Sequence, residues 1–282
     1  MEDKGSTATD WLSTALDQVW AQISTVLQYP ILSSQRIYLL YLAMALVFAL
    51  FVFSRSDNNR NIKLSQAPSK FLAFLFPASV WKDPSAWLDV RYFFFHNIIW
   101  ISLFGSLGIA ITDWAVAATS SGLLARSGGV PLFTTEQYFL GGIIYMVVLI
   151  AAIDFIAFGI HYLQHKIPFL WAFHKVHHSA TVMHPLTNYR EHPVDNVLYI
   201  VGTGLLTGVL AGTSIFLFGG VFSPPTILGV SLLAFAFNFL AYNLRHSHIW
   251  LRWPGRLNYV FGCPAHHQVH HSCHPDHIDR NF

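Results

Sequence analysis

Residues 139–165 read FLGGIIYMVVLIAAIDFIAFGIHYLQH. The part before His161 is apolar except for Asp154 and is long enough to cross a bilayer, because a spanning helix needs about 20 apolar residues. His161 and His165 follow directly, and residues four apart share one face of a helix. The sequence therefore predicts a membrane helix that presents two imidazoles at one end.

Four other apolar runs are long enough, or nearly so, to cross a bilayer: residues 37–53, 92–112, 197–219 and 226–242. The chain is 54% hydrophobic and 11% charged, whereas a soluble domain is about 25% charged. We therefore expect an all-α, multi-span transmembrane bundle of about five spans. The short stretch 71–80 is expected to be interfacial or re-entrant. We divide the chain into a polar N-terminal segment (1–36), a membrane region (37–138) and a catalytic region (139–282).

The distribution of positive charge orients these spans. With five spans, the loops 54–91, 161–196 and 243–282 share one side and carry most of the 16 Lys and Arg residues. Because Lys and Arg concentrate in cytoplasmic loops, we expect a cytoplasmic, histidine-rich helical cap and an N-terminus on the other side, with Arg36. If the first run does not insert, the N-terminus changes sides and the histidines do not. No basic stripe indicates nucleic-acid binding.

Histidine is unusually frequent, with 16 residues, and all but His96 lie after residue 160. Two further clusters are His174-Lys-Val-His177-His178 and His267-Gln-Val-His270-His271. On helices, their spacings of three and four would put each cluster on one stripe. Neutral imidazole suits Zn, Cu, Fe and Ni, and eight to ten imidazoles are too many for one ion and enough for two. The absence of a His-Glu-x-x-His motif argues against a zincin.

Two other features of the apolar runs bear on function. Asp154 is an intramembrane carboxylate, which is a functional candidate; it could bond the outer nitrogen of a ligating histidine or serve helix packing as a protonated group. Gly204, Gly208 and Gly212 recur every four residues. This spacing predicts close packing against another membrane helix, either within this chain or in a homodimer.

The combined pattern resembles a known superfamily. It consists of Asp154, His161-x-x-x-His165, His174-Lys-Val-His177-His178-Ser, Tyr189-Arg-Glu-His192-Pro193, His246-Ser, and His266 to His271 leading to Ile278–Phe282. Over roughly residues 139–282 it is similar to the fatty acid hydroxylase / sterol desaturase superfamily. The resemblance implies a cytoplasmic di-iron site (Zn can replace Fe in a purified form), O2 as co-substrate, a lipid substrate and a separate electron-transfer protein or other external electron donor.

The resemblance also assigns roles to residues. The implied metal ligands are His161, His165, His174, His177, His178, His246, His248, His267, His270 and His271. Many members have asparagine at the place of His248. Asp154 and His192 are the implied catalytic-site residues outside the ligand set. His184, His266, His274 and His277 are expected to be ordinary surface or hydrogen-bonding residues. Members commonly continue beyond the match to Phe282, so we expect either a truncated C-terminus or a differently built cap.

These inferences predict an O2-dependent hydroxylase or desaturase that acts on a sterol, a fatty acyl chain or a related lipid. Two alternatives remain open at this point. A metal transporter or sensor would need ligands along the spans, whereas these histidines gather at one membrane face. A membrane zinc-dependent hydrolase would need a carboxylate base beside three protein ligands, for which Glu191 is the obvious candidate, and would act without oxygen.

Overall fold

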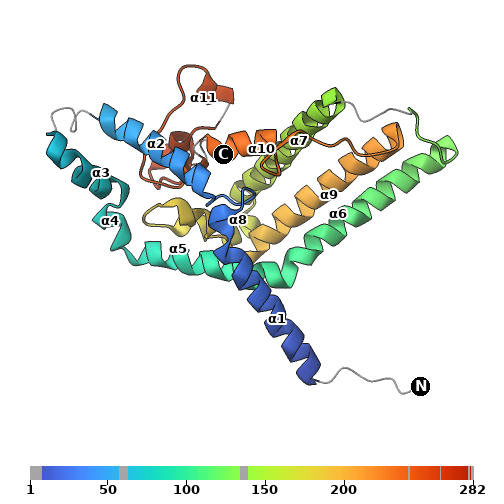
Figure 1. Ribbon diagram of the computed structural model, residues 1–282, viewed down its shortest axis with the longest axis horizontal. Coiled ribbons are helices and arrows are strands. Elements are labelled where there is room, and N and C mark those ends of the chain that lie inside the picture. The colour runs from blue at the N-terminus through green and yellow to red at the C-terminus, as the bar shows by residue number, and fades with distance from the viewer. Residues whose placement is uncertain are drawn as a thin grey trace.

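The computed structural model describes residues 8–56, 63–133, 139–240, 242–260, 262–278 and 280. Most of these residues are helical (Figure 1). The described strands are β1 (Thr226–Ile227) and β2 (Val230–Ser231), which pair antiparallel with Thr226 opposite Ser231. The predicted all-α class is confirmed.

Three long apolar helices lie side by side and form the membrane part of the protein: α6 (Ile101–Leu124), α7 (Phe139–Lys166) and α9 (Pro193–Phe218) (Figure 1). α6 continues a helical run that also includes α5 (Pro84–Phe94), η4 (Phe95–Trp100) and η5 (Ala125–Ser127). The run Pro84–Ser127, α7 and α9 are each long and apolar enough to cross a membrane. The chain is therefore an integral membrane protein.

The glycines of α9 allow it to approach α6 closely. A Cβ atom added at Gly208 would lie 2.5 Å from the Cβ of Ala115, and one added at Gly212 would lie 2.7 Å from the Cβ of Thr119. Such distances are far below van der Waals contact, so only glycine fits at these two positions. The prediction of close helix packing is confirmed within the chain itself, and it requires no second copy.

The first apolar run forms α2 (Leu39–Arg55), but its position differs from the expected one. The carbonyl of Arg36 accepts a hydrogen bond from Asn243 Nδ2 at 2.7 Å. At the other end of α2, Phe53 contacts Phe74, whose ring contacts His248. Because both ends of α2 lie beside the histidine-bearing loop, the prediction that Arg36 is on the opposite side from the histidines is wrong.

The expected span over residues 226–242 is also wrong as a single helix. β1 and β2 occupy its beginning, and α10 (Leu232–Phe239) has only 8 residues. A helix of this length rises about 12 Å, well short of the roughly 30 Å hydrocarbon core. The backbone turns at Leu228 and Gly229, which both have positive φ, and this turn divides an otherwise apolar run.

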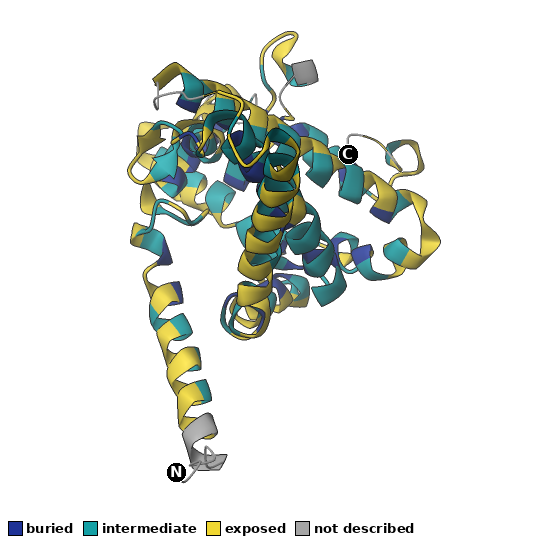
Figure 2. Ribbon diagram, turned by 90° about the vertical axis from the view of Figure 1, so that its right-hand side faces the viewer, coloured by how far each residue is buried: buried dark blue, intermediate teal, exposed yellow. Residues whose placement is uncertain are grey.

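The N-terminal segment forms α1 (Ala8–Leu27) and η1 (Tyr29–Ile31). α1 projects from the rest of the protein, and most of residues 12–27 are exposed (Figure 2). Its C-terminal part and η1 dock on the π-helical turn η4, where Gln22 Nε2 donates to the carbonyl of Asn97 at 2.8 Å and Tyr29 donates to Asn97 Oδ1 at 3.1 Å. This contact ties the N-terminal helix to the beginning of α6.

Short elements make up the remainder, much of it at the end of the bundle where α7 finishes and α9 starts (Figure 1). They are η3 (Leu64–Gln66), α3 (Ala67–Leu75), α4 (Ala78–Trp81), α8 (Pro168–His174), η6 (His177–Ser179), η7 (Pro185–Tyr189), η8 (Tyr242–Leu244), α11 (Leu257–Val260), α12 (Pro264–His270) and η9 (Pro275–His277). Ala45 and Ala49 of α2 form a buried core with Leu244, Ile249 and Leu251. This core holds the loop that carries His246.

Candidate metal centre

Eight histidines gather into two groups of four. Tetrad A consists of His161, His165, His178 and His270, and tetrad B consists of His177, His246, His267 and His271. Within each tetrad the ring nitrogens lie within 4.8 Å of one another. The two tetrads adjoin, since the rings of His178 (tetrad A) and His271 (tetrad B) stack with centroids 4.4 Å apart.

The local backbone decides which histidine joins which tetrad. His161 and His165 lie on one face of α7, and their rings stack at 5.0 Å, as the spacing of four predicts. The expected single stripe in the second cluster is wrong, because α8 ends at His174 and η6 begins at His177. The third cluster also divides, at the end of α12. The adjacent pairs His177–His178 and His270–His271 therefore each supply one ligand to tetrad A and one to tetrad B.

The distances within tetrad B fit a metal ion better than they fit hydrogen bonding. His246 Nε2 lies 2.9 Å from His267 Nε2 and 3.1 Å from His271 Nε2, and the last two atoms are 3.1 Å apart. Each neutral imidazole has one N–H group, so three mutually close nitrogens cannot all be paired as donor and acceptor. Nitrogens bound to one ion at 2.0–2.1 Å would lie roughly 3–3.4 Å apart.

The imidazoles are held in the neutral form that binds metals. Burial, reinforced by neighbouring His174, lowers the pKa of His177 to about 3. Burial also lowers the pKa values of His246, His267 and His271 well below 6.5. In tetrad A, His178 Nε2 is buried without a hydrogen-bond partner among the described residues. Leaving such an atom unsatisfied costs about 1–3 kcal/mol, a cost that a bound ion would remove.

Backbone carbonyls orient two of the ligands. His177 Nδ1 donates to the carbonyl of Arg190 at 3.1 Å, and His270 Nδ1 donates to the carbonyl of Arg280 at 3.0 Å. A proton held on Nδ1 leaves the Nε2 lone pair free for a metal, which is the usual arrangement around ligating histidines. The donor set, its neutrality and its orientation therefore fit two metal ions.

His174 lies beside tetrad A without belonging to it. Its ring is 4.8 Å from that of His161 and 5.0 Å from that of His178, centroid to centroid. Its Nδ1 lies 3.5 Å from Asp195 Oδ2, and Asp195 is held by Gln164, which donates at 3.0 Å. The Nε2 of His174 is buried without a hydrogen-bond partner among the described residues, and it is the additional nitrogen that tetrad A could use.

Three predicted site residues lie apart from the tetrads. His248 is exposed, and its Nε2 donates to the carbonyl of Phe74 at 2.6 Å. Asp154 is exposed on α7, and within the described parts of the chain it makes no hydrogen bond to a tetrad histidine. His192 begins α9, where its Nδ1 accepts a hydrogen bond from the backbone N–H of Val194 at 3.1 Å.

A buried polar network next to tetrad B was missed by sequence reasoning. Asp89 of α5 is fully buried and contacts Arg190, Thr187 and His184. The signal that could have found it is an acidic residue close to an apolar helical run, since such a group is expensive to bury and is usually paired. His184, expected to be a surface or hydrogen-bonding residue, is a buried hydrogen-bonding member of this network.

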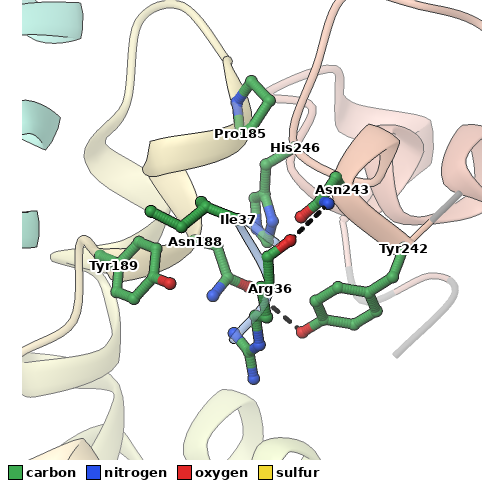
Figure 3. A pocket seen from close by; sticks show the side chains of 8 residues that line it. All are labelled: Arg36, Ile37, Pro185, Asn188, Tyr189, Tyr242, Asn243 and His246. Atoms are coloured by element: carbon green, nitrogen blue, oxygen red, sulfur yellow. Dashed lines mark hydrogen bonds between the residues drawn. The ribbon is translucent and has the colours of Figure 1, made fainter. Parts of the chain in front are cut away.

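A small cavity opens beside His246 (Figure 3). Its volume is about 10 Å³, which is room for roughly one water molecule. The Arg36 guanidinium lies 4.8 Å from the ring centre of Tyr242, whose hydroxyl donates to Asn188 Oδ1 at 3.3 Å. Polar side chains of the N-terminal segment and of the loops line this cavity and therefore lie next to His246 of tetrad B.

Comparison with known proteins agrees with this geometry. Residues 146–282, which contain every histidine of both tetrads, match the fatty acid hydroxylase family. This part of the chain belongs to the fatty acid hydroxylase family. The chain is 28% identical over 130 positions to alkylglycerol monooxygenase of Homo sapiens, and 27% identical over 133 positions to that of Danio rerio.

The alignments with these two relatives cover 46% of this chain and 25% of each relative. The chain thus matches about a quarter of the length of the curated relatives. No solved structure matches it significantly.

Proposed function

We propose that the protein is an O2-dependent lipid hydroxylase with a histidine-bound di-iron centre. The observation that carries the proposal is the pair of adjoining, buried, all-histidine tetrads at the end of the apolar helices. Two adjoining sites suit a reaction that needs O2 and two electrons, in which one oxygen atom enters the lipid and the other leaves as water. Membership in the superfamily and the alkylglycerol monooxygenase relatives support the same reaction class.

The chain's own residues would hold and orient the metals. The eight tetrad histidines supply neutral Nε2 donors, and His174 supplies a further nitrogen next to tetrad A. The carbonyls of Arg190 and Arg280 keep protons on the outer nitrogens of His177 and His270. Bound iron would supply the reductive activation of O2. Asp154 and His192 remain proposed contributors to catalysis, although neither is among the tetrads.

The same geometry weighs against the two alternatives. A hydrolase would need a carboxylate base at a metal with an open position, and both tetrads consist of histidine alone. Glu191, the candidate base, is in neither. A transporter would need ligands along the helices, whereas His161 and His165 occupy the last turns of α7 and the other ligands lie in loops and short helices.

Substrate, side and partners follow as parts of the proposal. The relatives' name suggests an alkylglycerol as the first substrate to test. The cytoplasmic side is supported by Lys166, Lys175 and Arg190, which lie at the histidine end of the bundle, because positive residues concentrate there. We propose a separate electron-transfer protein as the reductant. A homodimer remains compatible with the exposed apolar faces.

The test uses iron-loaded protein in lipid nanodiscs with a chemical reductant, an alkylglycerol and ¹⁸O2. We expect a hydroxylated product or its breakdown product that carries one ¹⁸O atom, formed only with both oxygen and metal. A panel of sterols and free fatty acids in parallel reactions identifies the substrate class. Product formation that continues at the same rate without oxygen would refute the proposed reaction and favour a hydrolase.

A further inference from the structure

α5 lies outside the region that matches the superfamily, yet its first turns contact the loop that carries His177. Ser85 Oγ accepts a hydrogen bond from the backbone N–H of Thr181 at 3.2 Å, and Asp83 Oδ1 accepts one from the Thr181 hydroxyl at 3.2 Å. Thr181 follows η6 (His177–Ser179) closely. The start of α5 therefore fixes the C-terminal side of the turn that presents His177.

The same part of α5 fixes the residue that orients His177. The Arg190 side chain is almost completely buried, and its guanidinium donates to Asp89 Oδ1, to Ser85 O at 2.6 Å and to Ser85 Oγ at 2.7 Å. A fourth contact, to Ser179 Oγ at 3.3 Å, reaches the end of η6. The guanidinium thus joins three segments of the chain at one point.

Asp89 is saturated with partners. Thr187 donates to its Oδ2 at 2.6 Å, and His184 Nε2 lies 3.2 Å from the same atom. Asp89 is fully buried, so its charge is stable there only because Arg190 and these donors surround it. Thr187 and His184 belong to the segment that immediately precedes Arg190, so Asp89 fixes that segment as well.

The geometry points to a positioning role: we infer that Asp89 and Arg190 hold the Arg190 carbonyl where it orients His177 for metal binding in tetrad B. The inference rests on the proposed metal centre. The 3.1 Å bond from His177 Nδ1 to this carbonyl directs the proton to Nδ1 and the lone pair of Nε2 toward the tetrad. If the Arg190 guanidinium lost its hydrogen bonds to Asp89 and Ser85, the Arg190 carbonyl would shift. His177 would then lose the hydrogen bond that orients its ring. Within the described part of the chain, no tetrad A side chain bonds Asp89 or Arg190.

The experiment is a zinc titration of full-length, metal-free protein in detergent against a chromophoric chelator. Wild-type protein should bind two ions. Replacing one partner would leave a buried, unpaired charge, so the main variant replaces both, Asp89→Leu with Arg190→Met, because such pairs can often be exchanged for apolar residues without loss of folding. It should bind one ion with wild-type affinity and the other about 10–100-fold more weakly, the usual effect of losing an outer-sphere partner.

Arg190→Lys is the second variant, since lysine keeps the charge but lacks the planar fork that contacts Asp89 and Ser85 together; it should weaken the same single site. The control is Ser214→Ala, which removes a buried hydrogen bond to Gly220 O at the far end of α9 and should leave both affinities unchanged.

Two unchanged sites in folded Asp89 and Arg190 variants, or equal weakening of both sites, would overturn the inference and leave the proposed function intact. Wild-type protein that binds no metal would overturn both.

Discussion

His177 and His178 are neighbours in the sequence, yet their imidazoles belong to different tetrads. The same division occurs between His270 and His271. Two short segments therefore each contribute one ligand to each of the two metal positions. This arrangement explains how eight ligands can be brought together by so few turns of backbone, and it ties the sites into one centre.

The loop after η8 offers a matched pair of histidines. His246→Ala removes a donor of tetrad B, whereas His248→Ala removes a side chain that bonds only the Phe74 carbonyl among the described residues. We expect His246→Ala to lower iron from about two to about one per chain and to abolish lipid oxidation. His248→Ala should retain both. Elemental analysis and product formation measure these outcomes, and equal behaviour of the two variants would contradict the ligand assignment.

The contact between α6 and α9 predicts a different phenotype for two glycines. Gly208→Ala places a Cβ atom 2.5 Å from Ala115, whereas a Cβ at Gly159 of α7 meets nothing within 4 Å. We expect Gly208→Ala to lower the free energy of unfolding by about 1–3 kcal/mol, the usual range for overpacking. Gly159→Ala should change it little. Thermal unfolding in detergent distinguishes the variants, and a stable Gly208→Ala protein would count against this packing.

Glu191 should make stability depend on pH. Burial raises the pKa of Glu191 from 4.5 to about 7, although Arg36 acts to lower it. The folded protein then binds this proton more tightly than the unfolded chain does. The free energy of unfolding therefore falls as pH rises from 4.5 to 7, and the whole loss is present above pH 7. Because Glu191 is only half-buried, we expect a loss of about 1–2 kcal/mol.

Glu191→Gln cannot ionise and provides the comparison. Its stability should fall less than that of the wild type between pH 5 and pH 8, so that the variant is the more stable protein at pH 8. Unfolding temperatures measured at intervals of pH give the difference directly. Parallel pH profiles for the two proteins would show that the carboxyl is not perturbed as described.

His192 should contribute to stability through the start of α9. Its Nδ1 accepts the N–H of Val194, which is a helix N-cap interaction. We expect His192→Ala to cost about 1 kcal/mol and His192→Asn to restore most of that loss, with both metals retained. A loss of metal from His192→Ala that asparagine does not restore would instead place His192 in the metal centre.

Much of the site could be predicted from local spacing, and the parts that failed have a physical cause. The spacing of four in His161-x-x-x-His165 holds because α7 continues to Lys166. A single stripe for the second cluster requires a continuous helix, but the helix ends at His174. Residue spacing predicts which side chains share a face only where the helix is continuous. The sequence therefore could not show that neighbouring histidines belong to different tetrads.

The arrangement of the N-terminal half was harder to predict, because it depends on contacts between distant segments. Hydropathy identified α6, α7 and α9 as long apolar helices. It could not show that α2 packs one face along the His246 loop, since a helix that packs against other protein segments can be as apolar as one in a bilayer. Asp89 belongs to the same class of feature, because its partners Thr187 and Arg190 are about a hundred residues away.

An anomalous difference map at the iron absorption edge, from crystals of the iron-loaded protein, would test the metal centre most directly. Two adjacent peaks are expected. One should lie among the Nε2 atoms of His161, His165, His178 and His270, and the other among those of His177, His246, His267 and His271. A single peak shared by all eight histidines, or iron bound elsewhere with both tetrads empty, would contradict the assignment of two sites.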